Sequence, residues 1–170
     1  MFTVNLIDLD RSGPIQFHRF VPMDHALWEG ADLELSGPVE VDLLVTATAT
    51  GQVLADGRLR APIRRRCRRC LEPVELVLDE ALSLVWEIKD ELEEEDDGEI
   101  RPLDPVGNQL DMQAAIREEL ILLAPAYVVC GAECRGLCPI CGIDRNKQEC
   151  DCTHDEPDPR WNALRDLGHE

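Results

Sequence analysis

The feature that most constrains this chain is a run of six cysteines between residues 130 and 152, out of eight in the 170-residue sequence. At its centre, Cys138-Pro-Ile-Cys141 has the form of a zinc knuckle. A tight turn presents two thiolates on one side, and Gly142 permits the left-handed backbone that closes it. Cys150 and Cys152 supply a second pair, and structural zinc takes four tetrahedral ligands. Because four thiolates leave no open position for a substrate, the run predicts a structural metal site and not a catalytic one.

The remaining cysteines extend this pattern to two sites. Cys67 and Cys70 lie between two stretches with strand patterning, where the chain must reverse, and two thiolates do not complete a zinc site. We expect one pair from the cysteine-rich run to join them and pin the sheet to that run, while the other four close a small C-terminal zinc ribbon. The predicted ligands are Cys67, Cys70, Cys130 and Cys134 in one site, and Cys138, Cys141, Cys150 and Cys152 in the other. Two alternatives stay open, namely a single site within residues 130–141 and a site in which His154 replaces a cysteine.

The energetics also favour a structural role for the metal. A structural zinc site contributes about 10–16 kcal/mol of apparent binding free energy. That matches or exceeds the whole net stability of a typical domain, about 5–15 kcal/mol. Residues 138–152 have almost no side chains with which to build a core, so we expect the ribbon to unfold without metal.

Nothing in the sequence predicts a secreted or membrane protein. It has no basic-then-apolar opening and no apolar run of about 18 residues. We therefore expect a cytoplasmic location and no membrane partner. In that compartment cysteines are more often metal ligands than disulfides.

The body of the chain has the alternation of a β-sheet. Between residues 33 and 88 apolar and polar residues alternate with period two, which predicts long strands over 39–50, 52–66 and 72–88. We interpret Asp56-Gly57 as a bulge inside the second strand, because a hairpin there would leave segments too short to be stable. Together the strands predict a twisted antiparallel sheet, or a half-barrel.

The N-terminal residues 1–30 are expected to form an arm on this sheet. Val4 to Leu9 reads as a strand, followed by a loop around Gly13. Four large apolar side chains would pack the arm onto the body: Phe17, Phe20, Val21 and Trp28.

A helix after the sheet completes an α+β body. Asp111 is a good N-cap for residues 112–123, apolar residues recur at helical spacing (Ile116, Leu120 and Leu123), and Pro125 ends the helix. We expect it to cover one face of the sheet. A second, short helix is predicted over 158–167. The chain is thus expected to divide into a β-rich body, residues 1–129, and a cysteine-rich zinc-binding segment with its short helix, residues 130–170.

Charge is distributed unevenly along the chain. The formal net charge is −18, which argues against broad adhesion to nucleic acid. Against this average, seven arginines lie within residues 58–69 with no acid among them, while residues 87–99 contain nine acids and one lysine. The acidic run is expected to be a solvated loop, or else a surface that holds a basic partner.

The arginines are candidates for nucleic-acid binding. On a strand alternate residues share a face, so we expect Arg58, Arg60, Arg64 and Arg66 to point one way, as a stripe for RNA phosphates, and Arg65 the other. No aromatic residues are interleaved with them, so sequence-specific reading of single strands is not expected. The alternative is a local one, in which these cations neutralise the thiolates of their own zinc site.

No enzyme class is supported by the motifs. A redox role for Cys67-Arg-Arg-Cys70 is disfavoured, because redox-active CxxC pairs sit at a helix N-terminus and here strand patterning lies on both sides. The sequence has no glycine-rich phosphate loop, no nucleophile elbow and no His–carboxylate–nucleophile set. We therefore expect a protein that is not an enzyme and has no small-molecule substrate.

Three of these motifs together resemble the YceD family. They are Cys67-Arg-Arg-Cys70-Leu-Glu-Pro-Val after a long strand, the helix with its flanks from Leu110 to Pro125, and Cys134-Arg-Gly-Leu-Cys-Pro-Ile-Cys-Gly followed by Cys-Asp-Cys and Asp-Pro-Arg-Trp-Asn-Ala-Leu. Their order spans residues 67–167. Where the family has an Asn-Leu-Asn-like turn after the knuckle, this chain has Ile143-Asp-Arg-Asn146.

The resemblance implies a non-catalytic role in making the large ribosomal subunit. The family is linked to accumulation of large-subunit ribosomal RNA, through processing or stability. Its genes often neighbour that of a small basic zinc-ribbon protein of the large subunit. The implied partners are therefore large-subunit rRNA or its precursor or, alternatively, a basic ribosomal protein for which this chain would act like a chaperone.

Overall fold

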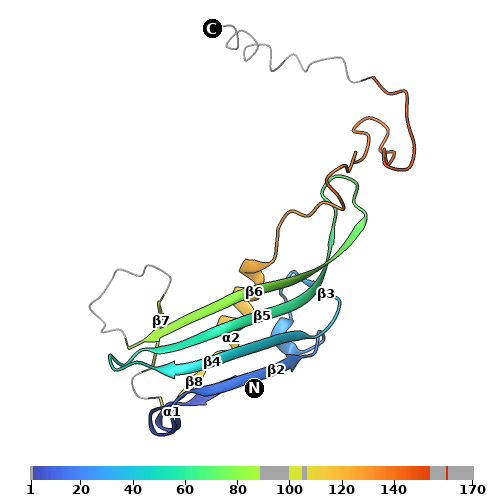
Figure 1. Cartoon of the computed structure of the whole chain (residues 1–170). Helices are drawn as coiled ribbons and strands as arrows, with labels where there is room; N and C mark the ends of the chain where they lie inside the picture. The colour runs from blue at the N-terminus through green and yellow to red at the C-terminus, as the bar shows by residue number, and fades with distance from the viewer. Residues whose placement is uncertain (1, 89–99, 105–106, 154–159, 161–170) are drawn as a thin grey trace.

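A six-stranded, twisted sheet forms the body of the protein in the computed structural model, which describes residues 2–88, 100–104, 107–153 and 160 (Figure 1). The strands lie in the order β2-β4-β5-β6-β7, and β3 also pairs with β5. Their bounds are β2 Ile15–Val21, β3 Glu34–Leu35, β4 Val39–Ala47, β5 Val53–Arg66, β6 Pro73–Glu87 and β7 Ile100–Pro102. The sheet does not close, and this mixed α+β arrangement confirms the predicted fold class at that level of detail.

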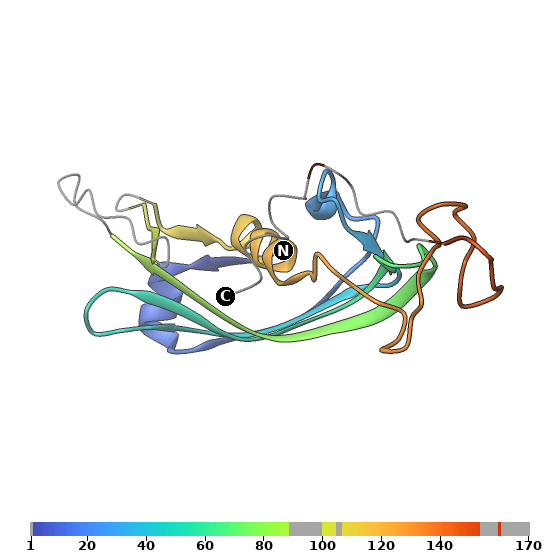
Figure 2. The ribbon, with the colours of Figure 1, turned by 90° about the horizontal axis from the view of Figure 1, so that it is seen from above.

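A second layer lies against the concave side of this sheet, as Figure 2 shows. It consists of a two-stranded antiparallel pair, two α-helices and one turn of 3-10 helix. The bounds are β1 Thr3–Asn5, α1 Leu6–Ser12, η1 Ala26–Trp28, β8 Gln109–Asp111 and α2 Gln113–Leu123. No described helix or strand covers the opposite side of the sheet, which we call the outer face.

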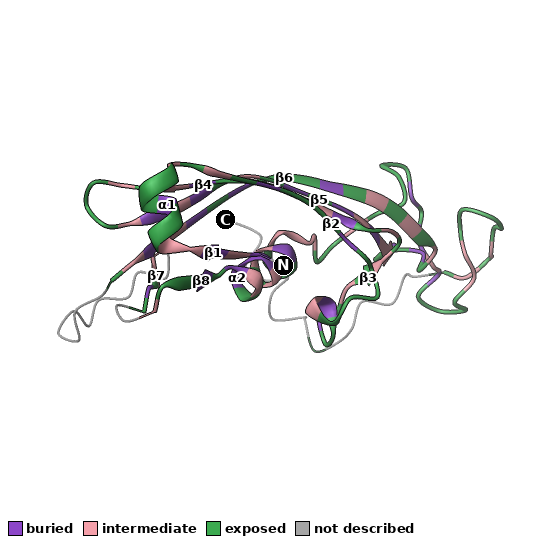
Figure 3. Cartoon of the chain, turned by 90° about the horizontal axis from the view of Figure 1, so that it is seen from below, coloured by how far each residue is buried: buried purple, intermediate pink, exposed green. Residues whose placement is uncertain are grey.

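The period-two pattern places the core between these two layers. On β4 the odd-numbered residues Val39, Val41, Leu43 and Val45 are fully buried, as are Leu59, Ala61 and Ile63 on β5. Burial is therefore concentrated on the concave side (Figure 3). Fully burying an aliphatic side chain of this size contributes about 1.5–3 kcal/mol, so this alternation is the main apolar driving force for the sheet.

Strands β5 and β6 pair without interruption over 14 residues, which corrects the expected bulge. Each residue of β5 from Val53 to Arg66 faces one residue of β6, and the register with β4 is equally regular across Gly57. Gly57 is needed for close approach and not for a turn. A Cβ built on it would lie 1.8 Å from the backbone oxygen of Asp42. The sequence showed the glycine, but only the neighbouring strand shows why it is there.

The N-terminal segment is built differently from the predicted arm. Strand β1 ends at Asn5, whose side-chain oxygen accepts hydrogen bonds from the N–H groups of Ile7 and Asp8 and so begins helix α1. Residues 15–21 are not an appendage, because they form β2, an edge strand of the main sheet. Of the four side chains expected to anchor the arm, Phe17, Val21 and Trp28 are buried, but Phe20 lies on the outer face, 60% exposed.

One strand pairing departs from the antiparallel expectation. β7 pairs with β6 in parallel, with Val85 opposite Ile100. Residues 89–99, which include Asp90–Glu99 of the acidic run, follow β6 and precede β7 in the sequence and lie outside the described residues. The predicted role of that run as a loop or a partner-binding surface thus stays a prediction.

Helix α2 packs its predicted apolar stripe against the core, on one face of the sheet. Ile116 and Leu120 are fully buried, Leu123 is partly buried against the core, and Ala124 is the C-cap immediately before Pro125. The structure places the N-cap at Met112, one residue later than predicted. Asp111 still accepts the Gln113 N–H at 3.0 Å.

An arginine from strand β7 ties the polar face of α2 to the sheet. Arg101 donates to Glu118 at 2.6 Å and to Glu119 at 3.0 Å. Neighbouring acids on a helix face therefore have a packing role here, which the sequence alone did not indicate. The predicted helix over 158–167 lies outside the described residues except for Arg160, so it and the division into residues 1–129 and 130–170 stay predictions.

The close approach at Gly57 yields a direct test. Replacing Gly57 with Ala should destabilise the protein by about 3 kcal/mol, the upper end for an overpacked site, because the obstructing atom belongs to the backbone of a central strand. Gly131→Ala is the matched control, since a Cβ there meets nothing within 4 Å. Urea denaturation of both variants would check this, and equal stabilities would contradict the assignment.

Candidate metal centres

The eight cysteines gather into the two groups of four that the spacing predicted. Within each group the four Sγ atoms lie within 4.8 Å of one another. We call Cys67, Cys70, Cys130 and Cys134 the first thiol set, and Cys138, Cys141, Cys150 and Cys152 the second thiol set. No disulfide joins any of these eight described cysteines. The alternative of a single site within residues 130–141 does not match this grouping, and His154 lies outside the described residues.

The sulfur–sulfur distances fit a tetrahedral ion. In the first thiol set, Cys67 and Cys134 are 3.7 Å apart, and Cys70 and Cys130 are 3.5 Å apart. Four sulfurs at about 2.3 Å from a zinc ion would be about 3.8 Å from one another. A disulfide requires about 2.0 Å, so these separations exclude a disulfide and match the spacing expected of ligands around a common cation. Each set could therefore hold one metal ion.

The first thiol set joins the end of the β5–β6 hairpin to the chain that leaves helix α2. Cys67 follows directly on β5, and its N–H donates to the Glu72 carbonyl at 2.8 Å to close the hairpin. The Arg68 N–H donates to the Val128 carbonyl at 2.8 Å, and Cys67 and Val128 form a parallel bridge. These contacts bring two segments about 60 residues apart in sequence into one site.

The protonation preferences of the first thiol set are unequal. Burial disfavours ionisation of Cys67, but the N–H groups of Cys70 and Arg69 outweigh it and lower its pKa to about 6. The Cys134 and Cys70 sulfurs, with burial, raise the pKa of Cys130 to about 12. The Glu72 N–H favours the thiolate of Cys70, yet burial and the Cys67 sulfur raise its pKa. Cys67 thus ionises readily, whereas Cys70 and Cys130 favour the protonated form until a cation compensates the charge.

The second thiol set repeats this electrostatic pattern. The N–H groups of Cys141 and Ile140 lower the pKa of Cys138 to about 6. The Cys141 sulfur and burial raise the pKa of Cys152 to about 12. The Cys152 N–H favours the Cys150 thiolate, but the Cys138 sulfur and burial raise the pKa of that thiol. Binding a divalent cation would release protons from either set.

The two CxxC turns have the same backbone design. In the second, the Gly142 N–H donates to the Cys138 carbonyl at 2.8 Å, with φ +74° at the glycine. In the first, the Leu71 N–H donates to the Cys67 carbonyl at 2.9 Å, with φ +63° at the leucine. Leu71 is the one residue other than glycine with a positive φ in the described part of the chain. The first knuckle therefore contains backbone strain that the second avoids.

The two thiol sets are connected through Asn146. Its Nδ2 group donates to the Cys134 sulfur at 3.6 Å, and its Oδ1 atom accepts the Arg135 N–H at 2.7 Å. Asp144 holds the asparagine in place by accepting its backbone N–H at 2.9 Å. That N–H is also the main cause of the lowered pKa of Asp144. Residues 138–152, which contain the second thiol set and which we call the second ribbon, thus contact a sulfur of the first thiol set through Asn146.

Further contacts fix the ribbon on the hairpin end. The Leu137 N–H donates to the Arg69 carbonyl at 2.8 Å, and Lys147 forms an ion pair with Glu72. We call residues 66–72 and 127–153, which contain all these contacts and both thiol sets, the cysteine tip. In Figure 1 it extends from the far end of β5 and β6. Asn146 was not among the predicted functional residues. Its position two residues after Asp144 could have indicated a turn in which the aspartate side chain accepts the Asn146 N–H.

The four predicted RNA-binding arginines share the outer face, but they do not form a free cationic stripe. Arg58 donates to Asp79 at 2.6 Å, and Arg64 bonds Glu75 at 2.5 Å and Glu34 at 3.2 Å. Arg60 lies in register between Glu40 and Asp79. Along β3 to β6, acids outnumber arginines on this face by seven to four: Glu34, Glu40, Asp42, Asp56, Glu75, Asp79 and Glu87. Arg65 points to the other side and donates to the Asp32 carbonyl.

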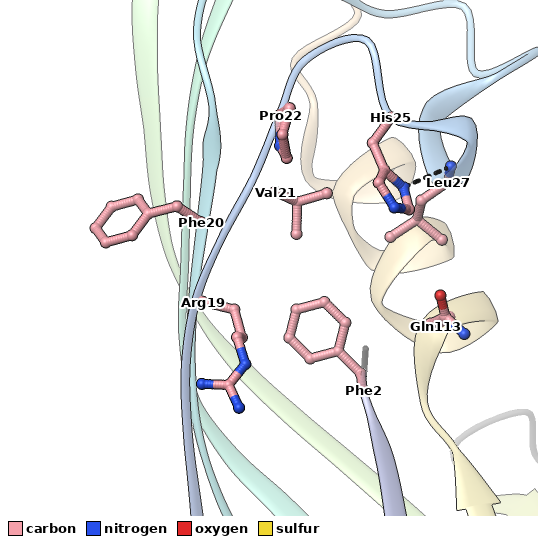
Figure 4. A pocket seen from close by; sticks show the side chains of 8 residues that line it. All are labelled: Phe2, Arg19, Phe20, Val21, Pro22, His25, Leu27 and Gln113. Atoms are coloured by element: carbon pink, nitrogen blue, oxygen red, sulfur yellow. Dashed lines mark hydrogen bonds between the residues drawn. The ribbon is translucent and has the colours of Figure 1, made fainter.

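A pocket of about 320 Å³ lies between β2, η1 and α2, as Figure 4 shows. Phe2, Val21 and Leu27 give it an apolar wall, and Arg19 and His25 contribute polar groups. His25 Nδ1 accepts the Leu27 N–H at 3.0 Å, so this histidine caps η1.

None of the helices in the described residues has both the length and the apolar character needed to cross a membrane.

Comparison with known proteins identifies relatives for most of the chain. The family model described as "Large ribosomal RNA subunit accumulation protein YceD" matches residues 55–168. An uncharacterized protein of Mycobacterium tuberculosis is 33% identical over 134 residues, which cover 76% of this chain and 61% of the relative. An uncharacterized protein of Mycobacterium leprae is 28% identical over 140 residues, 79% of this chain and 61% of the relative. The chain thus spans about three fifths of the length of these relatives.

A plant protein matches over a shorter stretch. The "Large ribosomal RNA subunit accumulation protein YCED homolog 1, chloroplastic" of Arabidopsis thaliana is 32% identical over 63 residues, 37% of this chain and 20% of the relative. No solved structure matches the chain.

The strained knuckle predicts opposite effects for two substitutions. Leu71→Gly should leave stability unchanged or raise it by up to about 1 kcal/mol, because the relieved strain of about 1–2 kcal/mol exceeds the entropic cost of glycine. Gly142→Ala should lower stability by about 1 kcal/mol, since strain is added in open space. Urea midpoints at a fixed zinc concentration would test both. A loss in Leu71→Gly as large as that in Gly142→Ala would contradict the strain assignment.

The Asn146 link predicts faster metal loss from the first thiol set. Asn146→Ala should release one of two bound zinc ions about 10-fold faster to a chromogenic chelator, because the donor to the Cys134 sulfur is lost. Asn146→Asp keeps the oxygen that accepts the Arg135 N–H but also lacks that donor, so it should release at least as fast. Gln148→Ala, two residues away, is the control. Unchanged release from both asparagine variants would exclude the link.

Proposed function

This chain belongs to the YceD family, and we propose on that basis that it is a non-catalytic factor in biogenesis of the large ribosomal subunit, supporting accumulation or processing of large-subunit rRNA. The observation that carries the proposal is the match of the family over residues 55–168, which includes all eight cysteines. The family is named for accumulation of an RNA and not for a reaction. Because the chain spans about three fifths of its mycobacterial relatives, the proposal concerns the shared part.

Two structural zinc ions belong to this proposal. The residues that would hold them are the eight cysteines of the two thiol sets, and the sulfur spacing and the backbone N–H groups directed at Cys67 and Cys138 support them as ligands. Zinc bound by four thiolates would supply a rigid crosslink. In the first thiol set the ion would join the β5–β6 hairpin end to the segment after α2. In the second thiol set the ion would hold residues 138–152 together. We assign the division into a body, residues 1–129, and a zinc-binding segment, residues 130–170, to the same proposal, together with a cytoplasmic location.

RNA contact is the first of two candidate modes of action. Of the four outer-face arginines, Arg60 and Arg66 have no ion pair among the described residues, so they are better placed for phosphate than Arg58 and Arg64. Each phosphate contact would make binding sensitive to salt. The RNA would be large-subunit rRNA or its precursor.

The second candidate is an acidic factor that holds a basic ribosomal protein. The excess of acids on the outer face of β3 to β6 and the formal charge of −18 favour it. Complementary charge would accelerate association and select basic partners. Exposed apolar side chains on the same face, Phe20 and Val77, could contribute contact area.

Deletion and complementation would test the proposed function. Cells lacking the gene should show a lower ratio of large- to small-subunit rRNA, and the wild-type chain should restore it. Cys138→Ser/Cys141→Ser should restore it poorly, and Gln148→Ala fully. An unchanged ratio in the deletion strain would overturn the proposal. Metal analysis of the purified wild-type chain should give two zinc equivalents, and a value near one would overturn the two-site division.

A further inference from the structure

An exposed aromatic ring lies against an arginine at the cysteine tip. The Tyr127 residue is 73% exposed, and the guanidinium carbon of Arg68 lies 4.3 Å from the centre of its ring. This distance is that of a cation–π contact, which uses one side of the ring. The exposure of the residue leaves room for a further flat group on the ring.

The backbone holds both members of this pair in place. Arg68 donates its N–H to the carbonyl of Val128, the residue after Tyr127, at 2.8 Å. Cys67 and Cys130 of the first thiol set flank the pair on its two segments. The two residues are far apart in sequence, which is why no aromatic residue was found among the arginines of the hairpin. A platform fixed in this way loses little conformational entropy when it binds.

The arginines around this pair have fewer carboxylate partners than Arg58 and Arg64 of the outer face. The cysteine tip contains six basic and five acidic residues, whereas the whole chain has 17 and 35. Lys147 pairs with Glu72, and Arg135 lies 3.7 Å from Glu149. Four arginines of the tip have no ion pair among the described residues: Arg66, Arg68, Arg69 and Arg145. Arg69 donates one N–H to the Cys134 carbonyl and retains others.

We propose that the Arg68–Tyr127 pair is a stacking platform for single-stranded RNA, with a base on the open side of the Tyr127 ring and neighbouring phosphates at Arg66 and Arg69. The inference rests on the proposed function and names its contact surface. It places the RNA at the cysteine tip and not along Arg58 and Arg64, whose guanidinium groups are already bonded to carboxylates. Base stacking on an aromatic ring tolerates any sequence, because every base has a π-face.

Stacking and directed contacts, not the overall field, would provide the affinity. Two filled Cys₄ zinc centres would each carry a formal charge of about −2, so the tip as a whole would not be positive. Contacts to two phosphates, at Arg66 and Arg69, predict a slope of about −1.4 for the logarithm of affinity against the logarithm of salt concentration on a single strand. A steep slope would indicate a broad basic surface, which this tip lacks.

Binding of short RNAs to the full-length, zinc-loaded chain would test the platform. With fluorescein-labelled 12-nucleotide oligo(U) and oligo(A) as probes, Tyr127→Ala should lower affinity between about fivefold and about a hundredfold. Tyr127→Phe should stay within about twofold of wild type, because it keeps the ring. Arg68→Ala should weaken binding, and Arg58→Ala, whose side chain is paired with Asp79, should not. Zinc content and far-ultraviolet circular dichroism would verify that each variant is folded.

Three outcomes would overturn the platform. They are wild-type affinity in Tyr127→Ala, an equal loss in Tyr127→Phe, and failure of the wild-type chain to bind either RNA. Loss of binding on replacing Arg60 alone would place the RNA on the outer face instead. If the chain bound no RNA but retained a basic ribosomal protein, the tip would be a protein-binding surface. The rRNA ratio in the deletion strain judges the proposed function separately from all of these.

Discussion

The cross-connection made by the first thiol set is the constraint on which the remainder of the tip depends. It joins Cys67 to Cys134 and Cys70 to Cys130, across 67 and 60 residues of sequence. Because these two segments meet there, the hairpin end, the exit from α2 and the second ribbon acquire one common geometry. The Asn146 side chain and the Leu137–Arg69 backbone bond then add the second ribbon to that frame. Apart from a small buried cluster of Cys67, Cys70 and Cys134 with Val74, no described apolar core holds these features together.

Much of the fold could be predicted because it depends on local alternation. The buried residues of β4 follow a strict period of two, and the stripe of α2 follows helical spacing, so both faces were identifiable from sequence. Several predictions were wrong where an adjacent strand determines the direction of a side chain or of a strand. Phe20 lies outward because the register with β4 directs it there. The parallel direction of β7 against β6 likewise could not be predicted from residue alternation. The missed helix α1 is instead a local error, because Asn5 caps it by accepting hydrogen bonds from the Ile7 and Asp8 N–H groups.

Some features of the candidate site could also be predicted from the sequence, and others could not. Spacing divided the cysteines into four close pairs, and the preferred combination of these pairs into two sets matches the grouping in the structure. Whether each arginine is free or ion-paired could not be predicted from alternation along the strand, because Arg58 and Arg64 form ion pairs with acids on other strands. Tyr127 likewise reaches Arg68 only through the folded chain. What a side chain faces across a sheet or a turn is a property of register, and register is set by the whole sheet.

The uninterrupted pairing of β5 with β6 has a consequence for how far the tip can lie from the core. An insertion of one residue in each strand would lengthen the hairpin by about 3.4 Å but exchange its inner and outer faces beyond the insertion point. Two residues in each strand would restore the faces and displace the tip by about 7 Å. The reach of the cysteine tip can therefore change only in steps of one full pleat. In this architecture the distance between the core and the cysteine tip is therefore set in discrete increments.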